Sequence, residues 1–543
     1  MQTSRTLHRW SRAVLTVALV VPLLGVAAAA QGDSSQPSSI QAHATVKASV
    51  EPGGPTALKD PALMPSTGSL MSTVKDLVDI APRATGTPGG RKAADYVARR
   101  FRDAGLKDVH FETADSFSWA ASDASLTVSK KPYSATPISH SLIAGADVPS
   151  HRTLGPKGLT APVIDIGSGA VVPDSVKGKI VLFDLKFQLP LAALALVTEF
   201  LWDPALQIID IPTLFTANPY ETSLKTTMKS LIDKGAVGAI GVLSDYFDSN
   251  KYHNEYYRKL AMTIPGFWVT KKAGEKIRSN LSADPTSTMK LTTDRRRVQA
   301  RTVVGFLPGK STDTIMVQSH HDSQGPGAVE DGTGTASVIG LADYYGALAR
   351  QKGAKPREKT LMFATFDTHF TGYQQHLAFA EKYVLKKQTK YRIVANTTIE
   401  HIGKQAKIGP DGQLQVLDQP EPSGIFENVN PFLKATIAGA MVKNDLRATA
   451  MLNATPLQAV GIPTDASFAL IAGIPVVSLI AGPMYMYDEA DTIDKVDVQR
   501  MRPMATAYAQ IINAIDTTPS DLIGIMPPPA ADLLTKIAVG LLL

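Results

Sequence analysis

The sequence of 543 residues contains no cysteine. It therefore has neither a disulfide framework nor a lipidated N-terminal cysteine, and outside the cell it must rely on packing or on a metal ion for stability. A large charge excess is also missing. The formal net charge is +6, and Arg5, Arg9 and Arg12 near the N-terminus carry three of these charges, which leaves +3 for the rest. This balance gives no support for nucleic-acid binding.

The N-terminal region is typical of an exported protein. Residues 1–30 combine a basic start with an apolar run that ends in Ala28-Ala29-Ala30, the pattern of a secretory signal peptide. A retained membrane anchor is the alternative, and the run is at the lower limit of length for crossing a bilayer. Residues 31–67 are rich in Ser, Pro, Gly and Gln and are predicted to form a disordered spacer. We expect a secreted, extracellular protein.

An HxD triplet follows an apolar run that reads as a buried strand, TIMVQS. Side chains alternate across a strand, so His320 and His321 are expected to face opposite sides, and only one can belong to a given site. We assign His320 to the site and a structural or supporting role to His321. Asp322 completes the triplet.

A glycine-rich acidic turn comes next and opens a helix at residues 335–350. It carries Glu330 and Asp331, which are expected beside the positive end of that helix. Together with the HxD strand, this turn predicts the start of a metal–carboxylate site. The alternative is that both carboxylates only cap the helix.

These motifs resemble the M28 family of zinc aminopeptidases, whose pattern here is HxDS followed by PGAxD(D/N)xxG. The likeness continues in order over roughly residues 68–515, from DIAPRATGTPGG in residues 79–106 to GIPVVSL and YDEADTIDKVD near the end. It implies an α/β fold, a mixed β-sheet flanked by helices, formed by residues 68–139 and 291–518. Alternating strand and helix patterns in the second half agree with this fold.

Residues 140–290 are predicted to be an insertion. Their SVKGKIVLFDL and KGAVGAIGVL resemble the protease-associated (PA) domain, a β-rich module expected to gate the cleft. Within it, residues 188–215 are unusually apolar but too interrupted to cross a membrane, so a lid, a hydrophobic substrate wall and core packing are the alternatives. The apolar tail, residues 519–543, is expected to dock on the body or to touch a membrane surface.

The resemblance also implies site residues. The family's metal ligands fall on His320, Glu330 and Glu400, and Asp322 matches the aspartate that follows the first histidine. Three further family positions carry other side chains. His369 stands at the general base, Phe370 at a glutamate ligand and Tyr487 at the closing histidine ligand; Asp465 matches a family aspartate, but Ala466 replaces the histidine after it.

These replacements affect metal binding and the transfer of a proton from water. Phenylalanine has no lone pair, so a dinuclear centre is excluded, while one divalent ion, zinc by resemblance, is compatible with His320, Glu330 and Glu400. The same set also suits manganese or magnesium. His369 has a suitable intrinsic pKa to replace the lost base, and the alternative is an ordinary buried histidine.

Three functions remain open from the sequence. The first is a divergent peptidase with at most one metal ion and His369 assisting water attack. The second is a non-peptidase acid–base enzyme for a hydrophobic substrate, and the third is a catalytically silent binding protein. We rank an altered site above a conventional aminopeptidase. The substrate is a peptide or small molecule and no partner protein is implied. The predicted catalytic residues are His369, Asp331, Asp322, Tyr487 and Asp488.

Overall fold

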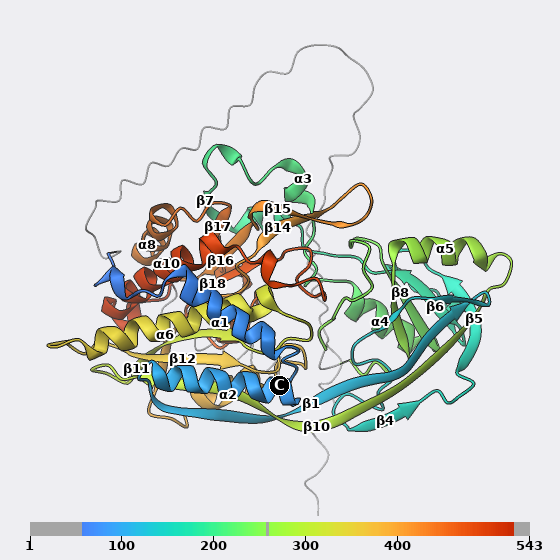
Figure 1. Cartoon of the computed structure of the whole chain (residues 1–543), viewed down its shortest axis with the longest axis horizontal. Helices are drawn as coiled ribbons and strands as arrows, with labels where there is room; N and C mark the ends of the chain where they lie inside the picture. Colours follow the sequence, from blue (N-terminus) through green and yellow to red (C-terminus); the bar gives the residue numbers. More distant parts are fainter. Residues whose placement is uncertain (1–56, 257–259, 526–543) are drawn as a thin grey trace, which may run out of the picture. The chain divides into compact units, whose positions relative to one another are not determined.

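The computed structural model describes residues 57–256 and 260–525 (Figure 1). The predicted signal peptide, the first part of the spacer and the tail from residue 526 lie outside the described residues. The last part of the predicted spacer is packed, because Pro61–Leu63 form a 3-10 helix, η1, and Met64 is buried. The folded chain therefore begins before residue 67.

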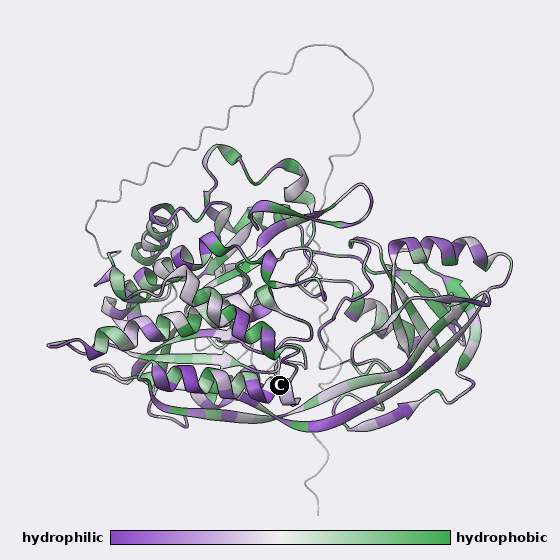
Figure 2. Cartoon of the chain, viewed as in Figure 1, coloured by the Kyte–Doolittle hydropathy of each residue, from purple (hydrophilic) through white to green (hydrophobic). Residues whose placement is uncertain are grey.

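A mixed sheet forms the centre of the fold, as predicted. Its parallel strands are almost entirely buried on both faces, which is typical of a sheet covered by helices. Figure 2 shows the hydrophobic residues along these strands. The parallel strands, in spatial order, are β12 (Thr360–Phe366), β11 (Asp313–His320), β13 (Arg392–Thr398) and β18 (Val476–Ala481). On the far side of β18 lies antiparallel β16 (Ser423–Glu427), which pairs with β17 (Thr449–Asn453).

Helices cover both faces of this sheet. One face carries helices whose buried residues share one apolar cluster, and Figure 1 shows α2 and α6 beside β11 and β12. The helices are α1 (Thr67–Ile80), α2 (Pro88–Asp103), α6 (Gly334–Arg350), α8 (Pro431–Lys443) and α10 (Val498–Thr517). The other face carries a second apolar cluster near α7 (Gln374–Phe379), η6 (Ala380–Leu385) and α9 (Ser467–Ile471). This arrangement confirms the predicted α/β class.

The carboxyl ends of the parallel strands meet at one edge of the sheet, which is where open α/β sheets bind ligands. His320 is the last residue of β11, and His369 follows β12 by three residues. Glu400 follows β13 by two residues, and Tyr487 lies in the loop after β18. The topology therefore brings together motifs that are far apart in the sequence.

Two long antiparallel strands lead from this sheet to the inserted segment, as Figure 1 shows. They are β1 (Lys107–Val128) and β10 (Thr286–Leu307), each of 22 residues. The inserted segment is built on four parallel strands, β5 (Leu159–Asp165), β6 (Ile180–Asp184), β8 (Gly238–Leu243) and β9 (Gly266–Thr270), with helices α4 (Leu224–Asp233) and α5 (Lys271–Leu281). Strand β10 crosses the boundary predicted at residue 290 and pairs with β5 before it.

The apolar segment 188–215 joins the edge of the central sheet. Its strand β7 (Thr198–Trp202) pairs antiparallel with β17, and Leu194 packs against the core. In contrast, Leu196 is 86% and Phe215 is 70% exposed, so the segment is only partly packed. None of the helices in residues 57–256 and 260–525 is long and apolar enough to cross a membrane.

Arg83 fastens the start of the domain to the loop after β11. Its guanidinium is fully buried and donates hydrogen bonds to four backbone carbonyls at 2.9 to 3.1 Å, those of His321, Leu77, Pro326 and Gly327. The carbonyl of Leu77 lies in the last turn of α1, and those of Pro326 and Gly327 directly precede the acidic turn. Arg83 therefore fixes the backbone from which Glu330 projects.

We expect Arg83→Ala to lower the free energy of unfolding by about 3 kcal/mol or more, because each buried carbonyl left without a donor costs about 1–3 kcal/mol. Urea unfolding followed by circular dichroism measures the change. Arg91→Ala is the matched control, since this exposed arginine donates to one carbonyl, that of Gly86. The control is expected to stay within about 0.5 kcal/mol of the wild type. Equal losses in the two variants would contradict the role of Arg83.

Candidate metal centre and active-site pocket

Three imidazoles converge on the carboxylate of Glu330, which lies in the acidic turn η5 (Ala328–Thr333). The Nε2 atoms of His320 and His369 lie 3.3 and 3.6 Å from Glu330 Oε1. The Nε2 atom of His401 contacts the other oxygen, Oε2. All four side chains are buried. His320 and His369 also stack, with ring centroids 4.1 Å apart and planes inclined by 16°.

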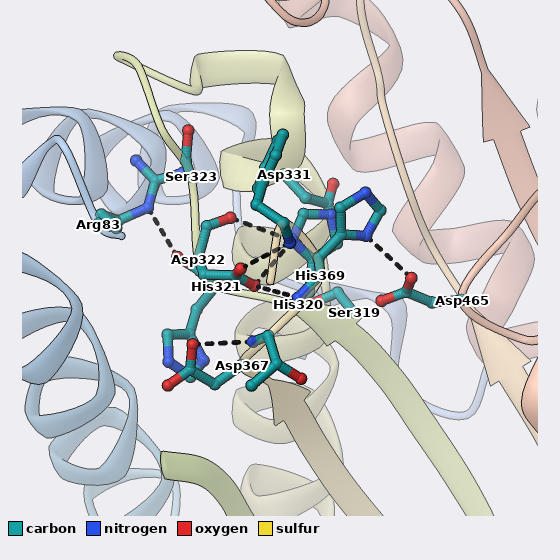
Figure 3. A network of polar contacts seen from close by, with 12 residues as sticks. Arg83, Ser319, His320, His321, Asp322, Ser323, Asp331, Asp367, His369 and Asp465 are labelled. Atoms are coloured by element: carbon teal, nitrogen blue, oxygen red, sulfur yellow. Dashed lines mark hydrogen bonds and ion pairs between the residues drawn. The ribbon is translucent and has the colours of Figure 1, made fainter. Parts of the chain in front are cut away.

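The second nitrogen of each ring lies against an oxygen atom. Figure 3 shows the His369 ring beside Asp465, and the distance from Nδ1 to Asp465 Oδ1 is 3.0 Å. The Nδ1 atoms of His320 and His401 lie 3.1 and 2.7 Å from the backbone oxygens of Asp322 and Ala481. When Nδ1 donates to these oxygens, the Nε2 lone pair is free to bind a metal ion.

Burial and charge act in opposite directions on these groups. Burial favours neutral histidine, but Asp322 and Glu330 raise the pKa of His320 well above its usual value, and Asp465 does the same for the pKa of His369. Glu330 raises the pKa of His401 to about 9. Burial favours the protonated form of Glu330, but His401 and His320 hold its pKa below the usual range. Protons and a metal ion would compete for the same Nε2 atoms.

The residues present fit one metal ion. His320, Glu330 and His369 each offer one ligand atom, and these atoms lie within 4.8 Å of one another. Within the described part of the chain, His320 Nε2 and both carboxylate oxygens of Glu330 are buried without a hydrogen-bond partner. Two imidazoles and one carboxylate form a ligand set of catalytic zinc sites, which keep a fourth position open.

Glu400, the third ligand predicted from the sequence, is not part of this group. Its Oε1 accepts a hydrogen bond of 3.0 Å from the backbone N–H of Asp465, and its Oε2 is buried with no hydrogen-bond partner among the described residues. Burial, together with the charge of Asp465, raises the pKa of Glu400 well above its usual value. Glu400 lines the pocket beside the histidines.

Aromatic side chains occupy the positions of the two other family ligands. Phe370 is buried, and its ring centroid lies 5.4 Å from that of Tyr487. The phenol of Tyr487 donates a 2.7 Å hydrogen bond to Glu255 Oε1 and lies 3.3 Å from His369 Nε2. Neither position contributes to the ligand group found in the described residues.

The three predicted catalytic aspartates accept hydrogen bonds from neighbouring groups and do not face the pocket. Asp331 Oδ1 accepts hydrogen bonds from the N–H groups of Gly334 and His401, so the capping alternative describes it, and burial raises its pKa to about 6. Asp322 accepts from the N–H groups of His369 and Phe370. Asp488 accepts from Ser249 Oγ at 2.7 Å and from the N–H of Ala490. None of the three aspartates lines the pocket described next.

A pocket of about 220 Å³ opens beside His369 and His401. Its polar wall includes three glutamates, and its remaining wall is aromatic or aliphatic. The glutamates are Glu221, Glu255 and Glu400, and the apolar and aromatic residues are Tyr220, Tyr373, Ile462, Pro463, Phe468, Ile480 and Tyr487. The pocket therefore suits a small group with a positive charge and an apolar side chain.

Two residues of the site were not anticipated. His401 directly follows Glu400 in the TTIEHIG segment. A histidine there is a signal for a site residue, but the family resemblance assigned the role at this motif to Glu400 alone. Glu255 comes from the inserted segment and has no motif around it. Its place in the pocket follows from the tertiary structure alone.

Residues 302–512 match the family model of peptidase family M28. We refer to this part of the chain, which is similar to that family, as the M28 domain. No curated protein sequence matches the chain. The His320, Glu330 and His369 group lies in this domain and could hold a metal ion.

Solved structures share the fold. The zinc aminopeptidase BSAP from Bacillus subtilis has a TM-score of 0.57 and 17% identity and covers 85% of this chain and 99% of its own. A peptidase M28 precursor from Shewanella amazonensis SB2B has a TM-score of 0.62 and 19% identity, with 86% and 96% covered. An aminopeptidase from Aneurinibacillus sp. strain AM-1 has a TM-score of 0.55 and 18% identity, with 86% and 97% covered. At these identities the likeness shows the fold alone.

Asp465 is expected to set the metal affinity of the M28 domain. It contacts His369 Nδ1 at 3.0 Å and His376 Nε2 at 3.1 Å. We expect Asp465→Asn to weaken zinc binding by about 10- to 100-fold, as loss of a partner that orients a ligand histidine does. Competition with a chromophoric chelator measures the affinity. Asp343→Asn on α6, which removes an ion pair with Arg100, is the control and should leave zinc affinity unchanged.

Proposed function

We propose that this chain is a metallohydrolase of the aminopeptidase type that works with one divalent ion, preferably zinc, held by His320, Glu330 and His369. The observation that supports it is the buried group of three ligand atoms within 4.8 Å, in which the Glu330 carboxylate lies against imidazoles but accepts no hydrogen bond from the described residues. In this proposal His369 is a metal ligand and not the substitute base expected from the sequence. Glu400 lines the pocket and is not a metal ligand in this proposal.

The metal ion, when bound, would act as a Lewis acid and lower the pKa of a water molecule. The chain's own residues have the remaining tasks. Asp322 and Asp465 orient the imidazoles of His320 and His369 so that Nε2 faces Glu330. His401 holds the second oxygen of Glu330. Phe370 and Tyr487 lie beside this group, with their ring centroids 5.4 Å apart.

The substrate class that we propose is a short peptide or amino-acid amide with a free amino group. The pocket is small, and its Glu400 Oε2 is buried without a hydrogen-bond partner among the described residues, so a substrate ammonium group would satisfy it. The rings of Tyr373 and Phe468 lie 5.2 Å apart and offer an apolar wall to the first side chain. The signal-peptide pattern of residues 1–30 supports an extracellular site of action.

Metal analysis of the purified protein tests this proposal. We expect about one zinc ion per chain and hydrolysis of aminoacyl 4-nitroanilides; His320→Ala should remove the metal and lower kcat by 100-fold or more, since it deletes one of three ligands. The control is His321→Asn, on the neighbouring residue, whose ring contacts Thr365 and not Glu330.

The metal content separates the alternatives. Two ions per chain would contradict the single ligand group. A metal-free protein without hydrolase activity would favour the acid–base enzyme or the silent binding protein. Retained metal in His320→Ala would place the ion elsewhere.

A further inference from the structure

The inserted segment reaches into the pocket of the M28 domain. The loop after β8 carries Glu255, which lines the pocket together with His369 and Tyr487. Its Oε1 lies 3.5 Å from His369 Nε2, and its side chain is 16% exposed. Glu255 is therefore both next to the proposed metal ligand and accessible from the pocket.

Backbone hydrogen bonds hold this loop on the M28 domain. The N–H of His253 donates to the carbonyl of Tyr487 at 2.7 Å, and the N–H of Tyr256 donates to the carbonyl of Phe370 at 3.1 Å. These bonds flank Glu255 on both sides. They attach the loop at the two positions where aromatic residues replace family ligands.

Side-chain contacts then orient the carboxylate. Tyr487 Oη donates to Glu255 Oε1 at 2.7 Å, and Tyr373 Oη donates to Oε2 at 2.9 Å. Both phenols project from the M28 domain. Tyr487, at the position of the family's closing histidine ligand, thus holds a carboxylate from the inserted segment.

Other carboxylates near the ligand group are less suited to exchange protons with a substrate. Glu330 is held by three imidazoles, and Asp465 is held by His369 and His376. Of the three glutamates that line the pocket in the described part of the chain, Glu255 is the one in contact with a proposed metal ligand.

We propose that Glu255 is the proton acceptor and donor of the hydrolysis, in place of the glutamate base that this sequence lacks at residue 369. This inference rests on the proposed function. Water oxygen bonds to the scissile carbonyl carbon while one of its protons passes to Glu255. As the C–N bond breaks, Glu255 returns the proton to the leaving nitrogen, so that one water is consumed and an acid and an amine are formed. Tyr373 and Tyr487 are positioning residues.

Glu255→Gln tests this assignment, because glutamine keeps the size and can still contact both phenols, accepting from one and donating to the oxygen of the other, but cannot take up the proton. We expect kcat on aminoacyl 4-nitroanilides to fall by about 100-fold or more, the usual share of a general base, with KM within about threefold of the wild type. Zinc content should stay at the wild-type value. Glu255→Asp should recover part of kcat, since it keeps the carboxylate.

Glu275→Gln is the matched control, because Glu275 lies on α5 of the same inserted segment, is exposed and does not line the pocket. Its kcat should remain within about threefold of the wild type. An active Glu255→Gln variant would overturn the assignment and leave the proposed function intact. Loss of zinc in Glu255→Gln would make Glu255 a structural or ligating residue and would also overturn it. An inactive, zinc-free wild type would overturn the proposed function itself.

Discussion

The buried carboxylate of Glu330 is the constraint around which the site is arranged. A charged group that is 1% exposed requires compensating charge or a metal ion, since an isolated buried carboxylate is strongly destabilising. His320, His369 and His401 supply that compensation from the end of β11 and from the loops that follow β12 and β13. Their positions depend in turn on Asp465 and on backbone oxygens that fix the opposite nitrogen of each ring.

The sheet explains how these loops meet. Parallel strands place their carboxyl ends at one edge, so residues separated by 80 positions between His320 and Glu400 become neighbours. Arg83 then fixes the turn that carries Glu330 by binding four carbonyls. The inserted segment adds a wall that the M28 domain does not itself contain. Its loop is hydrogen-bonded to the backbone of Tyr487 and Phe370.

The aromatic replacements and the inserted loop form one consistent arrangement. Phe370 removes a donor, and the phenol of Tyr487 cannot easily replace an imidazole ligand but can hold a carboxylate. That carboxylate is Glu255. In the proposed function, the donors His320, Glu330 and His369 therefore surround a single metal position, where the family resemblance implies a pair of ions. The fold of the family is retained, and the chemistry depends on the site.

The sequence by itself determined the α/β class, the order of the M28 motifs and the two residues, His320 and Glu330, that lie at the centre of the site. Short motifs on a strand and on a helix-opening turn are local features, so a sequence can reveal them. It pointed to Glu400 and not to the adjacent His401, whose Nε2 contacts Glu330, because the direction of adjacent side chains depends on the backbone, and His401 has a φ of 61° outside any regular strand. Only the tertiary structure decided the place of Glu255, since a contact between a loop of the insertion and residues 370 and 487 leaves no periodicity or spacing in the chain.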